Sequence, residues 1–481
     1  MATLAVQQKR IGVAYWMQDV LRQIEKVSDG FESEPVHDLR TALRRCRSIA
    51  DGIMVFDCDP AWKKMKRAGK QLFQSLGGLR DTHVLRDWVE QLSPERDATA
   101  RALEAFLDRR EQELRATVAA ALEEFDRNKW STWSRQLPAR AVRIPLDSPV
   151  FAHLALERWH QARALHRRAL RNRTKVAFHD LRIGIKRFRY TVENCLPSLH
   201  EFWSADLKEI QDVLGDVHDL DVLWQTALAI KVFPDSESHE HWRMRVEQER
   251  NIRLQKYREK MVGPDSLWKS WREALPRTDE LRSLGFRRLE IWASSLESNQ
   301  AHANHVTELA LQLFDGLADQ VPIAKQESSR WILRAAAFMH DVGYARTNRG
   351  RHKVSARLIR KIIPPPGWTD DEIRTVSLVA RYHRGALPSE TQIRFRTLSE
   401  SKRWLVQFLG GILRLACACD MEQDAKIRKV QVEASGPVLM LRAQGYEEAS
   451  SLAEHLAAAR YLLEVAYHRP VFILPGEVHA A

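Results

Sequence analysis

Long apolar segments and a secretory start are absent from this sequence. No apolar run among the 481 residues is long enough to span a bilayer. The first residues turn polar at Gln7, Gln8 and Lys9, so we expect no secretory signal. The five cysteines have neither the spacing of a disulfide framework nor that of a zinc finger. We therefore expect free thiols in a reducing cytosol, hence a cytoplasmic protein without a membrane segment.

Acidic residues are fewer than basic ones. The 63 Asp and Glu residues face 75 Lys and Arg residues, which gives a formal charge of +12. This balance favours an acidic partner, such as nucleic acid, an anionic membrane surface or a phosphate polymer. The sequence also lacks helix-turn-helix, zinc-finger and RNA-binding signatures, so we do not expect nucleic acid as the partner. Its length allows two to four domains, and its richness in Leu, Ala, Arg and Glu favours helices.

A short basic motif is present twice. The sequence His-Asp-Leu-Arg begins at position 37 and again at position 179, 142 residues later. On a helix, the basic residues of each copy recur at i, i+3, i+7 and i+10, so they form one stripe. The two predicted stripes are His37, Arg40, Arg44 and Arg47, and His179, Arg182, Lys186 and Arg189.

The segments that follow the two motifs also correspond. Each motif helix precedes a second helix, which we expect to end at Gly77 and Gly215, before a further helix begins. Lys70 and Lys208 each lie seven residues before these glycines. The repetition predicts two similar helical units that face each other, joined through residues 135–149.

A single arginine-rich helix is most often only a solvated face. Here the stripe register and its repetition favour a ligand, since converging cations repel one another unless a polyanion neutralises them. Guanidinium groups match phosphate oxygens two at a time.

With its two His-Asp-Leu-Arg helices, the region from about residue 6 to residue 271 resembles the conserved-histidine α-helical (CHAD) domain. That family implies two four-helix bundles in a pseudo-twofold arrangement, which bind inorganic polyphosphate in a basic pore between them. Arg45 and Arg187 are implied supports. His218 stands where the first repeat has Arg80, so we expect the second bundle to bind the anion less tightly. The implied phosphate contacts are His37, Arg40, Arg44, Arg47, Lys70, His179, Arg182, Lys186, Arg189 and Lys208.

Histidines gather in the part of the chain after residue 300. Neutral imidazoles with one carboxylate, at the ends of several helices, predict a divalent cation site. A metal there would lower the pKa of a bound water and neutralise phosphate oxygens, as phosphoester hydrolysis requires. Taken singly, each histidine is more often a surface or satisfied residue. The candidate ligands are His302, His340, Asp341, His352 and His383.

This pattern resembles the HD phosphohydrolase superfamily, and residues 284–475 look like the C-terminal HD region of exopolyphosphatase/guanosine-pentaphosphatase proteins. The resemblance implies a divalent metal, such as Mn²⁺ or Mg²⁺. Cys417 stands where the superfamily has its last metal-binding Asp, and Tyr344 replaces a Lys. Asp420 lies almost one helical turn further on, so we do not expect it to substitute. Cys417 either ligates a soft metal as a thiolate or weakens the site.

The sequence thus predicts a mostly α protein, with two repeated four-helix bundles, then a helical HD-like domain with a small C-terminal α+β part. We expect polyphosphate binding with an HD-like accessory domain. The alternative is a metal-dependent HD phosphohydrolase that acts on polyphosphate or a phosphorylated nucleotide. Analogy also suggests a homodimer through the C-terminal domain and an association with polyphosphate granules. The predicted domains are 1–275 (repeats about 5–133 and 150–262), 280–425 and 426–481.

Overall fold

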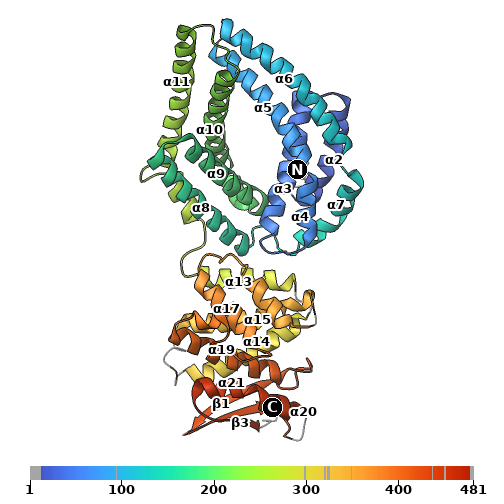
Figure 1. Ribbon diagram of the computed structural model, residues 1–481, viewed down its shortest axis with the longest axis vertical. Coiled ribbons are helices and arrows are strands. Elements are labelled where there is room, and N and C mark those ends of the chain that lie inside the picture. Colours follow the sequence, from blue (N-terminus) through green and yellow to red (C-terminus); the bar gives the residue numbers. More distant parts are fainter. Residues whose placement is uncertain are drawn as a thin grey trace. The chain divides into compact units, whose positions relative to one another are not determined.

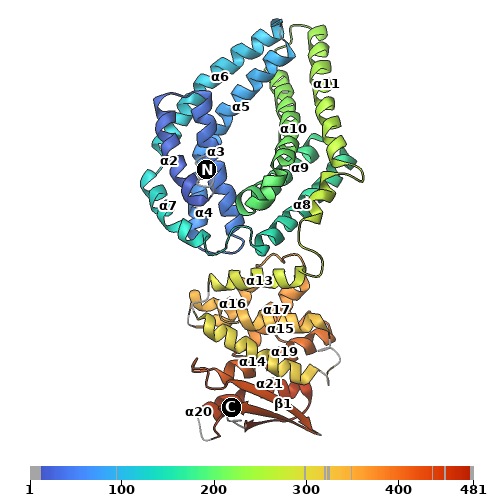
Figure 2. The ribbon, with the colours of Figure 1, turned by 180° about the vertical axis from the view of Figure 1, so that it is seen from behind.

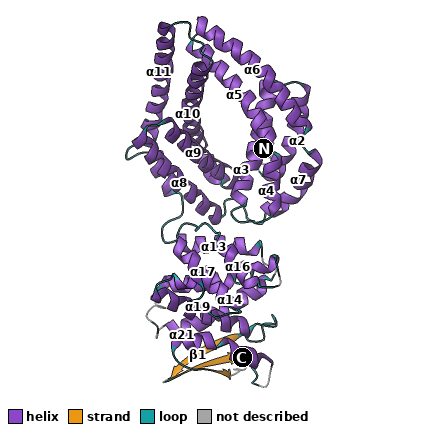
Figure 3. Ribbon diagram, viewed as in Figure 1, coloured by secondary structure: helices purple, strands orange, loops and turns teal. Residues whose placement is uncertain are grey.

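The computed structural model describes residues 12–93, 95–296, 299–318, 321, 326–347, 349–435, 437–448 and 451–476. The described chain is mostly helical, with one small sheet near its C-terminal end, as Figure 3 shows. It divides into two compact units, Met1–Glu280 and Leu281–Ala481. The expected fold class is confirmed. Within the described residues, no helix is both long and apolar enough to cross a membrane.

The first unit consists of two successive groups of helices. Aspartates begin several of them: the Asp59 carboxylate accepts a hydrogen bond from the Ala61 backbone N–H, and Asp97 does the same at Ala100. The start expected for the first helix, at Val6, lies outside the described residues. The first group is α2 (Val13–Asp29), α3 (Ser33–Ile53), α4 (Pro60–Ala68), α5 (Lys70–Leu92), α6 (Ala98–Glu123) and α7 (Arg127–Ala141). The second is α8 (Pro149–Asn172), α9 (Lys175–Cys195), α10 (Pro197–Ala229), α11 (Ser236–Met261) and α12 (Leu267–Glu273).

The expected helix breaks at Gly77 and Gly215 are wrong. Helix α5 continues through Gly77, and α10 continues through Gly215. Gly77 is needed for space, because a Cβ there would lie 2.6 Å from Nη1 of Arg40. The structure offers no comparable steric reason for Gly215. The join between the groups is also shorter than expected, since α7 runs on to Ala141 with Pro138 inside it.

The two groups meet at two places. Helices α3 and α9 pack together, and α5 contacts α10. At the second contact, Leu85 and Trp88 of α5 share an apolar cluster with Leu220 and Leu223 of α10. Figures 1 and 2 show α3 and α5 on one side of the unit, opposite α9 and α10. The two basic motif helices are therefore neighbours, as the repetition predicts.

The second unit has a helical part and a three-stranded sheet. Apolar residues of α14, α15, α17 and α19 form its core, and α14 also packs on β1. The sheet order is β1-β2-β3, with β2 antiparallel to β1 and parallel to β3. The sequence pattern of residues 447–467 predicts one helix, but the structure has two helices within this range, α20 and α21. The elements are α13 (Leu281–Ser294), α14 (Gln300–Ala318), α15 (Glu327–Met339), η1 (Val342–Ala345), α16 (Arg351–Ile359), α17 (Asp370–Tyr382), α18 (Ile393–Arg396), α19 (Glu400–Cys419), β1 (Lys429–Ser435), β2 (Val438–Gln444), α20 (Ser451–Ala459), α21 (Tyr461–Tyr467) and β3 (Val471–Pro475).

Candidate functional site

The first candidate site is the set of cations along α3 and α9, which we call the basic face. Its members come from both repeats, and the charge of Arg182 on α9 acts on Arg40 of α3. Most of these cations are half-buried, but His37 is exposed, as are Lys70 and Lys208 on the next helices. The half-buried members are Arg40, Arg44, Arg47, His179, Arg182, Lys186 and Arg189.

Two arginines of the first repeat lie against neutral groups. Arg40 Nη1 donates to the Phe73 carbonyl oxygen at 3.0 Å, and Arg47 Nη1 donates to the Lys66 carbonyl oxygen at 3.1 Å. The Phe73 ring lies 4.6 Å from the guanidinium carbon of Arg40 and 5.2 Å from that of Arg47. Carbonyl groups and a ring face orient a guanidinium without cancelling its charge. The first repeat thus presents two fixed positive groups.

Burial without full pairing marks the middle of the basic face. The Nε atoms of Arg44 and Arg182 are buried and donate no hydrogen bond to any described residue. Burial lowers the pKa of the Arg44 side chain, although the Tyr190 ring 5.4 Å away partly compensates. Unpaired buried donors cost free energy until an acceptor arrives. The arrangement is therefore suited to a ligand rich in anionic oxygen.

Lys186 has the most perturbed amine of the basic face. Burial lowers its pKa to about 7, and the nearby charges of Arg182 and Arg44 act in the same direction. Asp219 opposes this shift, while burial raises the pKa of the Asp219 carboxyl itself to about 6. The charges of Lys186 and Asp219 thus act on each other, but the two side chains form no ion pair among those of the described residues.

The two implied supports, Arg45 and Arg187, differ. Arg45 of α3 forms an ion pair with Glu193 of α9, and its Nη1 lies 3.5 Å from the Asn194 side-chain oxygen. Asn194 also donates to Ser48 Oγ at 3.3 Å. Arg187 is exposed. Arg45 therefore connects the two motif helices, whereas Arg187 lies at the surface.

His218 occupies the position of Arg80 in the second repeat. Its Nδ1 lies 3.5 Å from Nδ1 of His179. Burial and the charge of Arg182 lower the pKa of His218 to about 4, so its ring is neutral at pH 7. The substitution removes one positive charge from the second repeat at this pH.

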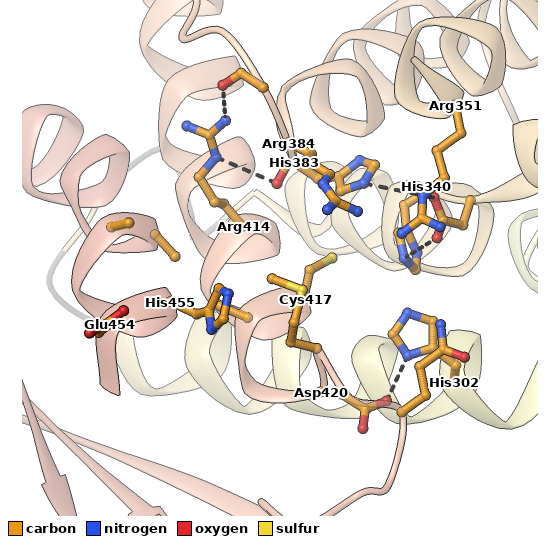
Figure 4. Close-up of a pocket in the computed structure, with 17 residues that line it drawn as sticks. His302, His340, Arg351, His383, Arg384, Arg414, Cys417, Asp420, Glu454 and His455 are labelled. Carbon is orange, nitrogen blue, oxygen red and sulfur yellow. Dashed lines mark hydrogen bonds and ion pairs between the residues drawn. The ribbon is translucent and has the colours of Figure 1, made fainter. Parts of the chain in front are cut away.

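The second candidate site, which we call the histidine centre, lies in the second unit. His302 comes from α14, His340 and Asp341 follow α15, His383 follows α17, and Cys417 lies in the last turns of α19. These side chains line a cavity of about 540 Å³. Figure 4 shows Cys417 between His383 and His302, with its sulfur on the side of the imidazoles. Four of the five predicted metal ligands, together with Cys417, are thus brought together.

Hydrogen bonds set the orientation of the three imidazoles. Nδ1 of His340 donates to the Ala337 carbonyl oxygen at 2.7 Å, and Nδ1 of His383 donates to that of Ala380 at 2.7 Å. Nδ1 of His302 lies 2.6 Å from the Asp420 carboxylate. A carbonyl oxygen only accepts, so His340 and His383 keep the Nε2 lone pair free. Such outer partners are typical of metal-ligating histidines.

The donor atoms form two overlapping sets, each with its atoms within 4.8 Å of one another. One set is His340, His383 and Cys417, and the other is His302, His340 and Asp341. Burial lowers the pKa of His340 and of His383, so both rings are neutral, which is the ligating form. Asp341 Oδ1 is buried and accepts no hydrogen bond from the described part of the chain. These residues fit a divalent metal.

His352 and Asp420 lie near the histidine centre but outside both donor sets. His352 lies outside both donor sets: its ring centroid is 6.3 Å from that of His383, and a Cβ on Gly385 would lie 3.0 Å from its Nε2. Asp420 pairs with His302, and our expectation that it does not substitute for the missing Asp stays a prediction. Helix α19 ends at Cys419, so the Asp420 backbone leaves the helical path and its carboxylate contacts His302.

Sequence patterns missed the arginines of the cavity. Arg351 Nε lies 3.2 Å from Asp341 Oδ1, and Arg414 Nε donates to the His383 carbonyl oxygen at 3.4 Å. Arg384 also lines the cavity. The sequence feature that could have indicated Arg351 is Gly343, because a Cβ on this residue would lie 2.4 Å from the Arg351 carbonyl oxygen. That close approach packs the start of α16 against the turn that carries Asp341.

Comparison with protein-family models gives two matches. Residues 16–228 match the CHAD domain, and residues 287–455 match domain III of the Ppx/GppA phosphatases. Both resemblances inferred from the sequence motifs are confirmed. The first match contains the whole basic face, and the second contains every residue of the two donor sets.

Proposed function

We propose that this chain, a CHAD domain followed by a region similar to domain III of Ppx/GppA phosphatases, binds inorganic polyphosphate along its basic face. The observation that carries the proposal is the pair of buried, unpaired Nε donors of Arg44 and Arg182 among converging cations. Phosphate oxygens are the natural partners of such donors, because guanidinium groups bind them two at a time.

The ligand that suits this face is a thin, flexible polyanion. Arg40, Arg44 and Lys186 come from two helices that pack together. The charge of Arg44 lowers the pKa of Arg40, and the charges of both arginines lower the pKa of Lys186. A chain of phosphates lying along α3 and α9 would neutralise several of these cations at once. Duplex DNA is far wider, so we expect long-chain polyphosphate to displace it in a competition experiment.

The histidine centre has a separate role in this proposal. Residues of the two donor sets would hold a divalent metal, and the metal would neutralise phosphate oxygens or lower the pKa of a bound water. Because Cys417 replaces the last metal-binding aspartate of the superfamily, we assign the centre to phosphate recognition before hydrolysis. A cytoplasmic location, granule association and a homodimer through the C-terminal domain stay predictions of the sequence.

A second candidate function is hydrolysis of polyphosphate or a phosphorylated nucleotide at the histidine centre. It is favoured by the cavity of about 540 Å³ in which arginine side chains lie next to the donor sets. The test is phosphate release from long-chain polyphosphate, with Mn²⁺ or Mg²⁺ and with chelator. Metal-dependent release that a His340→Ala/Asp341→Ala variant loses supports hydrolysis, whereas tight binding without release leaves a polyphosphate receptor.

The binding proposal is tested with the double variant Arg44→Ala/Lys186→Ala. Each side chain lost removes a charge-assisted contact of about 1.5–3 kcal/mol, so we expect affinity for polyphosphate to fall by at least about a hundredfold. Affinity is measured at fixed salt, because phosphate contacts weaken steeply as salt rises. Circular dichroism checks that the helical content is unchanged.

Two matched controls separate the sites. Arg187→Ala removes an exposed cation of the same motif and should leave affinity within about twofold. His340→Ala/Asp341→Ala should leave polymer binding largely intact. Unchanged affinity in the Arg44→Ala/Lys186→Ala variant would overturn the binding proposal, and loss of binding in a folded His340→Ala/Asp341→Ala variant would overturn the division between the two sites.

A further inference from the structure

We infer that the histidine centre selects one zinc-class metal ion, held by His340, His383 and Cys417, over the oxygen-preferring ions Mg²⁺ and Mn²⁺. This inference rests on the proposal that the centre binds a metal, and it goes further by naming the metal class and the ligand atoms. The residue that decides the metal class is Cys417, which the sequence pattern shows only as a difference from the aspartate of the superfamily.

The geometry of the donor sets carries the first step. Nε2 or Nδ1 of His340 and His383 and Sγ of Cys417 all lie within 4.8 Å of one another. A tetrahedral zinc ion with bonds of about 2.0–2.3 Å has its ligand atoms roughly 3.3–3.8 Å apart, so small side-chain rotations bring these atoms into position. The three residues come from the ends of α15 and α17 and from α19, elements that pack together in one core.

The second step is that the two donor sets cannot each bind an ion through His340. Both contain His340. Its Nδ1 hydrogen donates to the Ala337 carbonyl oxygen, so only the single Nε2 lone pair remains for a metal. One lone pair binds one ion. The centre is therefore mononuclear at His340, and the ion lies nearer to Cys417 and His383 or nearer to Asp341 and His302, according to which donors bind it more strongly.

The chemistry of the donors then decides between the two positions. A thiolate with two imidazoles suits Zn²⁺, Co²⁺ and Fe²⁺, whereas Mg²⁺ and Mn²⁺ prefer carboxylate and water oxygens. On the oxygen side, Arg351 Nε lies 3.2 Å from Asp341 Oδ1 and competes with a cation for that carboxylate. The thiolate position is thus the stronger one, and it accepts the softer metal.

Three protein ligands leave a fourth position on such an ion. The cavity of about 540 Å³ adjoins this position, and Arg384 and Arg414 line it. A phosphate oxygen or a water molecule is the fitting fourth ligand, since both guanidinium groups favour an anion there. The centre would in this way bind one phosphoryl group by metal and arginine together.

The experiment uses the purified full-length chain, stripped of metal with chelator and then exposed to equal amounts of Zn²⁺ and Mn²⁺. We expect one zinc and almost no manganese per chain after desalting, measured by elemental analysis. Loading with Co²⁺ should give the near-ultraviolet charge-transfer absorption of a cobalt–thiolate bond. Cys417→Ser should abolish this absorption and weaken zinc binding by at least about tenfold.

Two further variants complete the design. Cys419→Ser is the matched control, since Cys419 is a buried neighbour on α19 outside both donor sets, and it should change neither readout. Cys417→Asp should raise manganese binding relative to zinc. Where a variant fails to fold, the cobalt spectrum of the unaltered chain still decides.

The possible results separate the two proposals. Zinc bound without cobalt–thiolate absorption, and unaffected by Cys417→Ser, would overturn the inference while leaving a metal site in place. A chain that binds neither metal would overturn the metal site itself. Polyphosphate affinity, measured in the same samples, tests the basic face independently of both.

Discussion

The two repeats of the first unit share a motif but compensate its charge differently. In the first repeat, Arg40 and Arg47 lie against two carbonyl oxygens and the ring of Phe73. In the second repeat, Gln211 stands at the position of Phe73, and Arg189 lies 3.8 Å from the Glu193 carboxylate. Arg40 and Arg47 of the first repeat thus form no ion pair with a described carboxylate, whereas Arg189 of the second repeat is partly compensated by Glu193.

Two acidic residues extend this difference. Asp212 and Asp216 of α10 stand where α5 has Gln74 and Gly78, at equal distances from Gly215 and Gly77. Burial raises the pKa of Asp212, against the opposing charges of Lys208 and Arg189. Asp216 pairs with Arg253 at 3.0 Å. The comparison teaches that a repeated motif fixes where cations lie, while the neighbouring helix decides how much charge remains for a polyanion.

The largest effect that we expect concerns stability and comes from Arg45. Its side chain is 16% exposed and its partner Glu193 is 10% exposed. Arg45→Ala removes the closest cation of that buried carboxylate and leaves it only Arg189 and His200, each 3.8 Å away, which should lower the free energy of unfolding of the first unit by about 3 kcal/mol. Urea unfolding followed by tryptophan fluorescence measures the change.

Arg187→Ala is the matched change at the same motif position of the second repeat. Because Arg187 is exposed, its loss should alter the free energy of unfolding by less than about 0.5 kcal/mol. Equal effects of the two substitutions would show that the repeats are energetically symmetric and would contradict the comparison.

The sequence alone predicts most of the fold, because the relevant signals are local. The repeated motif and its stripe register predict α3 and α9, and alternating apolar residues predict β1 and β2. The prediction that a helix ends at Gly77 is wrong for a tertiary reason. The glycine makes room for the Arg40 side chain, and the helix continues despite the low helix propensity of glycine. Propensity weighs a residue by itself and does not register such a packing partner.

The candidate sites are predictable in part for a similar reason. The histidines indicate the centre from the sequence alone, because their positions near predicted helix ends can be read from the order of residues. The contact between Asp420 and His302 depends on where α19 ends, a matter of one residue that sequence patterns do not resolve. Arg351 and Arg414 carry no spacing signal of their own: Gly343 indicates only that the start of α16 packs closely, and the cavity identifies both arginines.

The next largest effect that we expect is a pH dependence of polyphosphate affinity, which should come from the second repeat alone. Lys186 has a pKa lowered to about 7 by burial and by Arg182, whereas the first repeat has Arg44, which stays charged in this range. As pH rises from 6 to 9, Lys186 loses its charge, and as pH rises through about 6, Asp219 gains one. Both changes disfavour an anion, so affinity for polyphosphate should fall by about tenfold.

The variant Lys186→Arg isolates this contribution. An arginine remains charged across the range, so the decline between pH 7 and pH 9 should nearly vanish, leaving only the part below pH 7 that comes from Asp219. Isothermal titration in two buffers of different ionisation enthalpy should show proton uptake on binding above pH 7 in the unaltered chain. An equally steep decline in Lys186→Arg would contradict the assignment.

The smallest effect should come from making the second repeat more like the first. Asp212→Gln copies the residue at position 74 and removes one negative charge beside Lys208 and Arg189. Since half-buried charge pairs contribute about 0.5–1 kcal/mol, affinity for polyphosphate should rise by about two- to fivefold. Glu209→Gln is the control on the same helix, because Glu209 pairs with Lys256 at 3.1 Å, away from the basic face. A gain in affinity in Asp212→Gln alone would show that the carboxylates of α10, rather than the motif on α9, limit how tightly the second repeat binds polyphosphate. If both variants bind polyphosphate equally tightly, the motif on α9 sets this limit.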